Sequence, residues 1–511
     1  MITLKNFRFS RRTIIFLIPV NLVFLFFVLL YLESIPSQHT KALTSYFKTP
    51  NTSPTFSTTP PPHAGTDSGP ESKPESELEV KPDIEPEVKP DVKPDVEPEI
   101  KPEVKPEVKP EVKDTLEEYG FRIQPNDVQF KYISDDPSIS KEDAFLKNEK
   151  IYLAEMAKDA SEPKDFNMHT IRPPPVDKID DYDRVSATIV SLVRNQEIDS
   201  ITYTIKQFET KFNSKFQYPY TFLNNDQFSE EFKERMLSLT NAQCEFVVIP
   251  AELWDKPDWI DKERETTAMK ALADLNIPYA RMASYHNMCR FYSGKFYNVP
   301  ELQKYKYYWR IEPDVQFFTD MNYDPFKYLQ NTGKKYGFTV NIYDIDETVE
   351  TLWPETLDFL NKDDNYKYVN PKGAFQWLTY NEQLPKKAKV ANGYSCCHFW
   401  SNFEIADLDF YRGEAYTKWM DHLEQTGKFY YERWGDAPVH SVAVGLFLDS
   451  EKEVHWFKDI GYVHNPYYNC PTSPFVEGCE AGKFCNFAHG NDQNCMATWI
   501  NQVGDSLKKV W

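Results

Sequence analysis

Glycine, basic residues and long apolar runs are all scarce in this sequence, and each scarcity argues against a class of protein. Only 17 of the 511 residues are glycine, and no GxGxxG or P-loop pattern occurs, so a standard Rossmann dehydrogenase or P-loop NTPase is not supported. Lys and Arg number 58 against 78 Asp and Glu, a net charge of −20. Nucleic-acid binding needs a basic footprint that displaces counterions from phosphates, so no nucleic-acid partner is expected. A mean hydropathy of −0.60 excludes a multi-span membrane protein.

The single long apolar run covers residues 13–32 and predicts a transmembrane anchor. Twenty residues at about 1.5 Å each cross about 30 Å of hydrocarbon. Residues 1–12 carry basic and no acidic side chains, so the positive-inside rule makes them a cytoplasmic tail and sends the rest of the chain into the lumen. A cleaved signal peptide is the alternative, but the run is longer than usual for one and Glu33–Gln38 is a poor cleavage site. We therefore expect an uncleaved signal-anchor.

Residues 33–113 have the composition of an extended stem. The first part is rich in Ser, Thr and Pro and contains a glycosylation sequon at Asn51. From Lys81 to Val112 proline recurs at every fourth position, which stops helix propagation and removes donors from any sheet. Such a tract is extended and solvated. We predict a disordered linker without chemistry of its own, followed by a luminal domain over residues 114–511.

No cysteine precedes position 244, and all eight lie in the predicted luminal domain. The oxidising compartment makes disulfides the default there. Four cysteines crowd the C-terminal end with a spacing that matches no zinc finger, which predicts a disulfide-stapled loop region whose pairing stays open. These four are Cys470, Cys479, Cys485 and Cys495.

Strand and helix patterns alternate through the first half of this domain. The alternation consists of strands at 184–193, 218–223 and 246–249 and helices at 197–211 and 229–239. Units of about 30 residues that alternate in this way indicate an α/β fold, with a parallel sheet and helices on both faces. Ligands of such sheets bind at the carboxyl ends of the strands.

Two acids interrupt an apolar, aromatic segment at Glu312-Pro313-Asp314. Residues 307–311 and 315–318 are expected strands, and proline between the acids places the site at a strand end or a bulge. Acids two residues apart project to the same side of an extended chain, which suits a hard divalent cation that bridges to substrate phosphates. The alternative is an ordinary strand-to-turn junction with solvated acids.

A lone carboxylate, Glu404, ends a stretch from Tyr394 that contains no other charged residue. Such a carboxylate is either paired or reactive. The alternative is a partly exposed Glu at a helix start with Ser401 as its cap. His398 in the same stretch fits a core imidazole better than a ligand.

Two further segments carry candidate polar groups. A Gly-Asp turn at Asp436 leads into an expected helix from His440 to Leu448. Asp436 and His440 could orient other groups or be simple polar residues at the start of the helix. His464 precedes Asn-Pro and therefore lies on a loop, where imidazole could bind a metal or could be a satisfied loop histidine.

Together these segments resemble the fungal Golgi α-1,2-mannosyltransferases, glycosyltransferase family fifteen, which build O-linked and N-linked mannan. The motifs occur in the right order over about residues 180–511: SYHNMCRFYSGKFY, YYWRIEPDVQF, CHFWSNFEIADLDFYR, YYERWGDAPVHS and FKDIGYVHNPYYNCP. The proline repeat and the length of this stem are not part of the family pattern.

The resemblance implies a GT-A-like fold, with a mixed sheet flanked by helices, that transfers mannose from GDP-mannose with retention and uses Mn²⁺. By position, Glu312 and His464 are the implied metal ligands, Glu404 the proposed nucleophile, and Tyr285 a group close to the reaction centre. Donor-binding roles are expected for Arg194, Arg310, Asp314 and Asp436. The sequence alone does not choose between a covalent glycosyl-Glu404 and a carboxylate that stabilises an oxocarbenium-like ion.

The implied acceptor is a mannose-terminated O-linked or N-linked glycan, and the implied location is the Golgi membrane, with a single span and a luminal catalytic domain. Two alternatives stay open. One is a mannosylphosphate transferase that uses the same donor. The other is an inactive, membrane-anchored glycan-binding protein, which the presence of Glu312, Glu404 and His464 disfavours.

Overall fold

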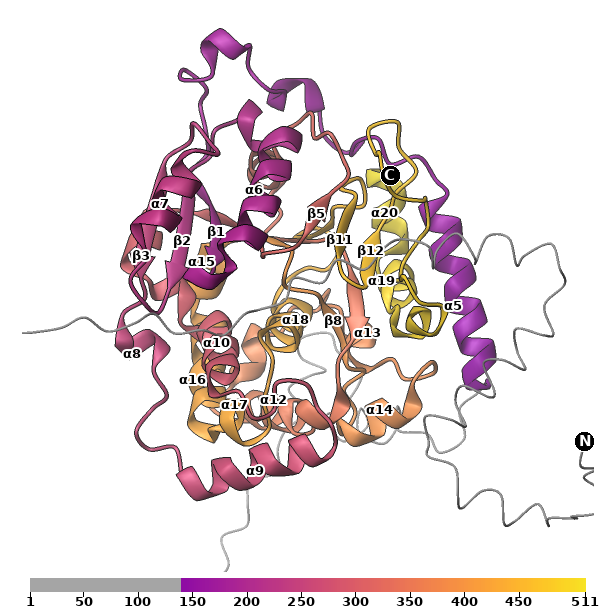
Figure 1. Cartoon of the computed structure of the whole chain (residues 1–511). Coiled ribbons are helices and arrows are strands. Elements are labelled where there is room, and N and C mark those ends of the chain that lie inside the picture. Colours follow the sequence, from indigo (N-terminus) through magenta and orange to yellow (C-terminus); the bar gives the residue numbers. More distant parts are fainter. Residues whose placement is uncertain (1–138) are drawn as a thin grey trace, which may run out of the picture. The chain divides into compact units, whose positions relative to one another are not determined.

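The computed structural model describes residues 139–511, shown in colour in Figure 1. The expected tail (1–12), anchor (13–32) and stem (33–113), together with the sequon at Asn51, lie outside the described residues. None of the helices formed by residues 139–511 combines the length and the apolar character that a bilayer crossing requires.

The predicted alternation in the first half of the domain is confirmed. Strands β1 (Ala187–Leu192), β2 (Tyr220–Asn224) and β3 (Cys244–Val248) are joined by helices α6 (Ile198–Lys211) and α7 (Glu230–Leu237). β1 pairs with β2 and β2 with β3, all parallel. The strands are short apolar runs, and α7 begins where the Ser229 hydroxyl accepts a hydrogen bond from the backbone N–H of Phe232.

The whole sheet is mixed, as the family resemblance implies, rather than parallel, as the strand–helix alternation alone predicts. Its order is β10-β6-β9-β4-β1-β2-β3, with β4 at Tyr307–Arg310, β6 at Tyr336–Phe338, β9 at Glu404–Asp407 and β10 at Val454–Trp456. β9 runs antiparallel to both β4 and β6, whereas the other pairs are parallel. The amino end of β9 therefore lies at the same edge as the carboxyl ends of β1, β2 and β4.

Apolar side chains cover both faces of this sheet. Neighbouring residues of β4 point to opposite faces, so Tyr308 belongs to one buried cluster and Trp309 to the other. The Tyr308 face is covered by α10 (Ala283–Gly294), α16 (Glu414–Thr426) and α18 (Asp436–Phe447), and the Trp309 face by α6, α7 and α11 (Pro325–Thr332). The prediction of helices on both faces is confirmed.

Two small antiparallel sheets complete the sheet structure. One contains β5 (Gln316–Phe317), β11 (Tyr462–His464) and β12 (Tyr467–Asn469), and the other contains β7 (Asn341–Tyr343) and β8 (Cys397–Phe399). Val463 lies opposite Gln316, so β11 brings His464 alongside the turn that follows β4.

The first helix of the described residues packs against the C-terminal helices. Helix α5 (Lys141–Met156) lies beside the C-terminal helices α19 (Met496–Gln502) and α20 (Gly504–Val510) in Figure 1. The remaining α-helices are α8 (Ala251–Trp254), α9 (Lys262–Asp274), α12 (Leu352–Leu360), α13 (Phe375–Thr379), α14 (Pro385–Val390), α15 (Leu408–Arg412) and α17 (Lys428–Tyr431).

Disulfides staple the C-terminal region as expected, but the four clustered cysteines do not all pair among themselves. Cys470 pairs with Cys479, whereas Cys495 pairs with Cys397, which is 98 residues earlier in the sequence. Cys485 is free, as are the cysteines at 244, 289 and 396.

Candidate active site

A buried arginine organises the carboxyl edge of the central sheet. Arg310 is the last residue of β4 and only 5% exposed. Its Nε donates to Glu312 Oε1 at 2.7 Å and its Nη1 donates to Asp436 Oδ2 at 2.5 Å, while its guanidinium lies 3.5 Å from the centre of the Tyr292 ring. Burial alone would lower the pKa of Arg310, but the two carboxylates raise it, so the side chain stays charged.

Asp436 is the first residue of α18, which begins four residues before the expected start at His440. Ser401 Oγ donates to Asp436 Oδ2 at 2.8 Å. Burial opposes ionisation, but the charges of Arg310 and His440 and these hydrogen bonds hold the pKa of Asp436 below its ordinary value. The helix N-terminus adds to this stabilisation of the negative charge.

Glu404 is completely buried at the first residue of β9, directly opposite Arg310. Its Oε1 accepts a hydrogen bond from the Tyr308 hydroxyl, and its Oε2 accepts from the Tyr336 hydroxyl at 2.8 Å and from His440 Nδ1 at 2.8 Å. Burial would raise the pKa of Glu404, but His440, Arg310 and Tyr308 outweigh it and lower the pKa.

His440 is the cation in the buried pair that it forms with Glu404. Both ring nitrogens face acceptors, Nδ1 the Glu404 carboxylate and Nε2 the Tyr292 carbonyl at 2.9 Å, and only the doubly protonated ring can donate to both. Burial would lower the pKa of His440, but the Glu404 charge raises it. We name Arg310, Glu312, Glu404, Asp436 and His440 the carboxyl-edge site.

The interpretation of Glu404 as a partly exposed residue at a helix start, with Ser401 as the cap, is wrong. Glu404 is buried and begins a strand, and Ser401 donates to Asp436 instead. The interpretation as a paired carboxylate is confirmed. Both oxygens are engaged by neighbouring donors, and the side chain has no exposed surface.

The two acids after β4 do not share one side of an extended chain. Asp314 has a φ of +62° and is exposed, so the chain turns at Pro313-Asp314 and the alternation of side chains breaks. Only Glu312, with a side chain 20% exposed, remains at the carboxyl-edge site. Burial raises the pKa of Glu312 although Arg310 opposes the shift.

His464 has the features of a metal ligand, although it is the last residue of strand β11 and does not lie on a loop as expected. Its ring lies at 4.9 Å, edge-on, against Trp400, and its buried Nδ1 has no hydrogen-bond partner among residues 139–511. Burial and the charge of Arg310 lower the pKa of His464, so the ring is neutral and can ligate. Mn²⁺ accepts mixed carboxylate and imidazole ligands, so Glu312 and His464 fit the predicted cation.

One other acid–histidine cluster occurs within the described chain, but it does not resemble a metal site. Glu355, Asp358 and His422 bring one ligand atom each within 4.8 Å of one another. Lys428 pairs with Glu355 at 2.7 Å and Lys362 pairs with Asp358, so lysines already neutralise both carboxylates.

Tyr285 and Arg194 lie apart from the hydrogen bonds of the carboxyl-edge site. Tyr285 is half-buried on α10, where its ring stacks on Tyr279 at 4.8 Å. Arg194 follows β1, as expected, but its side chain is 60% exposed and pairs with Glu197 at 2.8 Å.

Sequence reasoning missed Arg433, which precedes the Trp-Gly-Asp motif. It is 5% exposed, has a φ of +69°, and its guanidinium lies 5.3 Å from the centre of the Tyr285 ring. Its buried Nε has no hydrogen-bond partner in the part of the chain that the structure describes. The available signal was its position beside the motif of Asp436.

Sequence reasoning also missed the tyrosines that surround Glu404. Tyr308 and Tyr336 lie on the two strands that flank β9, and Tyr292 on α10 supplies both a ring for Arg310 and a carbonyl for His440. Their sequence signal is weak, because 31 tyrosines occur in the chain.

The sequence of this chain is similar to a family of mannosyltransferases and to individual fungal members of it. The family described as glycolipid 2-alpha-mannosyltransferase matches residues 142–504. The probable mannosyltransferase KTR4 of Saccharomyces cerevisiae is 47% identical over 365 residues, which are 70% of this chain and 77% of that protein. The O-glycoside alpha-1,2-mannosyltransferase omh1 of Schizosaccharomyces pombe is 41% identical over 306 residues, 60% of this chain and 76% of that protein.

Solved structures agree with this assignment. The crystal structure of Ktr4p from S. cerevisiae in complex with GDP superposes with a TM-score of 0.71 at 43% identity, over 76% of this chain and 99% of that one. Core-mannan synthase A of Aspergillus fumigatus in its Mn/GDP form gives 0.62 at 45% identity, over 68% and 91%. The predicted family is confirmed: this chain belongs to the glycolipid 2-alpha-mannosyltransferase family.

Proposed function

We propose that this chain is a retaining α-1,2-mannosyltransferase that transfers mannose from GDP-mannose to mannose-terminated O-linked or N-linked glycans. The observation that carries the proposal is the carboxyl-edge site, in which Arg310 and His440 hold three carboxylates at the edge where α/β sheets bind ligands. Family membership and the GDP-bound relatives support the donor. Nucleotide release from GDP-mannose with methyl α-mannoside as acceptor tests it.

The charge balance of the site supports a requirement for a cation. Arg310 and His440 face three carboxylates, Glu312, Glu404 and Asp436, so the donor's diphosphate would add uncompensated negative charge. Mn²⁺ held by Glu312 and His464 would supply Lewis-acid neutralisation of the leaving diphosphate. The Mn/GDP form of a relative supports this choice of metal.

Arg433 is suited to bind the diphosphate directly. Its Nε is a buried donor without a partner among the described residues, and leaving such a donor unpaired is unfavourable unless a ligand supplies the acceptor. A phosphate oxygen is the acceptor that a guanidinium binds best. We therefore assign Arg433 to the donor and expect Arg310, whose Nε and Nη1 already donate to Glu312 and Asp436, to fix the positions of these two carboxylates.

The geometry favours one of the two retaining routes. A covalent route needs a carboxylate oxygen free to attack the anomeric carbon, but three donors surround Glu404 and none of its surface is exposed. A fixed buried negative charge instead stabilises positive charge that develops on the sugar. We propose that mannose leaves and is transferred on the same face, with Glu404 as the fixed charge.

The proposed setting is the Golgi membrane, with residues 13–32 as a type II anchor and Asn51 glycosylated. The apolar run, its basic flank and the sequon support this topology. In intact vesicles the catalytic domain should resist added protease, and glycosidase treatment should increase mobility of the chain on gels. Digestion of the domain in intact vesicles would reverse the orientation.

The products separate this function from its alternatives. Mannosyl transfer releases GDP, whereas mannosylphosphate transfer releases GMP and leaves an acid-labile phosphodiester on the glycan. An inactive glycan-binding protein releases neither nucleotide. Chromatography of the nucleotide product therefore decides between the three.

A further inference from the structure

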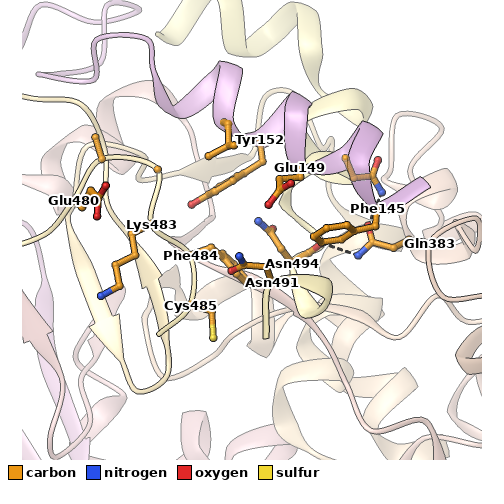
Figure 2. Close-up of a pocket in the computed structure, with 14 residues that line it drawn as sticks. Phe145, Glu149, Tyr152, Gln383, Glu480, Lys483, Phe484, Cys485, Asn491 and Asn494 are labelled. Atoms are coloured by element: carbon orange, nitrogen blue, oxygen red, sulfur yellow. Dashed lines mark hydrogen bonds between the residues drawn. The ribbon is translucent and has the colours of Figure 1, made fainter. Parts of the chain in front are cut away.

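A polar cavity outside the carboxyl-edge site lies between α5 and the C-terminal segment 480–494. Its volume is about 260 Å³. Figure 2 shows Phe145, Glu149 and Tyr152 reaching from α5 toward Phe484, Asn491 and Asn494. None of the residues that line it belongs to the carboxyl-edge site.

Buried polar atoms of the cavity wall have no partners within residues 139–511. They are Asn148 Oδ1, Tyr152 Oη and Asn491 Oδ1. Asn148 and Tyr152 are only 3% and 2% exposed, and the orientation of Asn148 is fixed because its Nδ2 donates to Gln383 Oε1 at 2.6 Å. Unpaired buried polar groups cost about 1–3 kcal/mol each, so the wall is suited to a ligand that supplies hydroxyl donors and acceptors.

The remaining wall defines the class of ligand. Tyr152 and Phe484 meet edge to face at 5.8 Å and provide apolar surface, while Glu149 adds a carboxylate that can accept from neighbouring hydroxyls. A volume of about 260 Å³ is enough for one sugar ring. A neutral polyhydroxylated ring with one apolar face matches these features.

A continuous series of aromatic contacts joins this cavity to the candidate metal ligand. Phe484 contacts Tyr467 at 5.4 Å, Tyr467 contacts Trp400 at 5.4 Å, and Trp400 contacts His464 at 4.9 Å. The segment that forms the cavity wall is therefore packed onto the segment that carries His464.

We propose that the cavity between α5 and segment 480–494 is a second saccharide site, which binds one sugar residue of a mannose-containing glycan. The choice of mannose rests on the proposed function. The sugar can be a distal residue of the acceptor under extension or a residue of a separate glycan chain, since both present the same chemistry.

Direct binding tests the site without using transfer. Saturation-transfer NMR is recorded on the purified full-length chain with methyl α-mannoside and α-1,2-mannobiose, in the absence of GDP-mannose. The variants are Tyr152→Phe, which removes one hydroxyl, and Glu149→Gln. The matched control is Glu142→Gln, an exposed acid in the first turn of the same helix that does not line the cavity.

We expect each cavity variant to weaken one binding component about fivefold, because Tyr152→Phe loses a hydroxyl and Glu149→Gln loses one acceptor oxygen and the negative charge. Glu142→Gln should bind as the wild type does. Identical binding by all four folded chains, or equal competition by glycerol, would overturn the proposal. Because no donor is present, this outcome is independent of whether the chain transfers mannose.

Kinetics with acceptors of different length identify the source of the sugar. If the bound sugar is a distal part of the acceptor, Tyr152→Phe raises KM for a long oligomannoside with kcat unchanged and leaves both constants unchanged for methyl α-mannoside. If KM for the long acceptor is also unchanged while the NMR component is weakened, the site binds a separate glycan. Either result supports the site.

Discussion

Replacing Glu404 by Gln keeps the shape of the side chain and removes the negative charge that pairs with His440. In the wild type His440 donates from both nitrogens, to Glu404 and to the Tyr292 carbonyl. In Glu404→Gln the imidazolium loses its counterion, and its Nδ1–H then faces an amide group that carries no charge. At pH 7.5 His440 can respond by losing that proton, so the substitution should destabilise the fold by only about 1–3 kcal/mol.

The loss of folding stability caused by Glu404→Gln should grow as the pH falls. The folded pKa of His440 is raised in the wild type, so its contribution to stability is complete below about pH 6.5 and is lost as the pH rises through the folded pKa. The lowered pKa of Glu404 makes its contribution complete above about pH 4.5, the ordinary value for a Glu. In the variant, burial lowers the pKa of His440, so stability is lost below about pH 6.5.

Denaturant unfolding at pH 7.5 and 5.5 measures this difference. With the two pKa shifts in opposite directions, the gap between wild type and variant should widen by as much as about 2.7 kcal/mol over two pH units. The control is Asp407→Asn at the other end of β9, whose carboxylate pairs with the half-exposed Lys306 at 3.1 Å. It should show a small loss without this pH dependence.

The same variant should lose about 10²–10³-fold in kcat with little change in GDP-mannose affinity, because charge on the sugar develops only in the transition state. A loss of 10³ corresponds to about 4 kcal/mol. A Glu404→Gln protein with wild-type stability at both pH values would refute the paired-charge reasoning. A trapped glycosyl-Glu404 adduct in the wild type would establish the covalent route instead.

Three further predictions follow from individual contacts. Chelator should abolish nucleotide release and Mn²⁺ should restore it best, while His464→Ala should raise the Mn²⁺ concentration for half-maximal activity about tenfold or more at an unchanged melting temperature; full activity in chelator would contradict both ligands. Burial raises the pKa of Asp459 to about 7, so its charged form destabilises the folded state at pH 8 and its protonated form does not at pH 4. Asp459→Asn should therefore stabilise the protein by about 1–3 kcal/mol at pH 8 and not at pH 4, measured by denaturant unfolding. Replacing both Cys397 and Cys495 by Ala opens a loop of 98 residues and should cost about 4.7 kcal/mol in the same assay; an unchanged unfolding midpoint would show that the bridge does not form.

Local sequence patterns were sufficient to predict the strands and helices in the first half of the fold. The elements from β1 to β3 are adjacent in sequence and space, and their apolar runs and caps are local signals. β9 could not be placed in the same way, because its partners β4 and β6 are far from it in the sequence. The left-handed backbone at Asp314 also has no clear local signal, so the expectation of acids on one side of a strand was wrong.

The charge at Glu404 was predictable, but its environment was not. A single acid in an uncharged aromatic segment must be paired or reactive, which identified Glu404 without identifying its partners. Those partners, Tyr308, Tyr336 and His440, are separated from it by 96, 68 and 36 residues. The antiparallel insertion of β9 between β4 and β6 brings Tyr308 and Tyr336 to Glu404, and helix α18 supplies His440.

The assignment of donor and product can be tested most directly by a single reaction. The purified chain is incubated with GDP-mannose, Mn²⁺ and methyl α-mannoside, the nucleotide is identified by chromatography, and the linkage of the disaccharide is determined by NMR. We expect one GDP for each α-1,2-linked dimannoside formed. Release of GMP with a phosphodiester product, a β-linked disaccharide, or no nucleotide release from the folded chain would contradict this assignment.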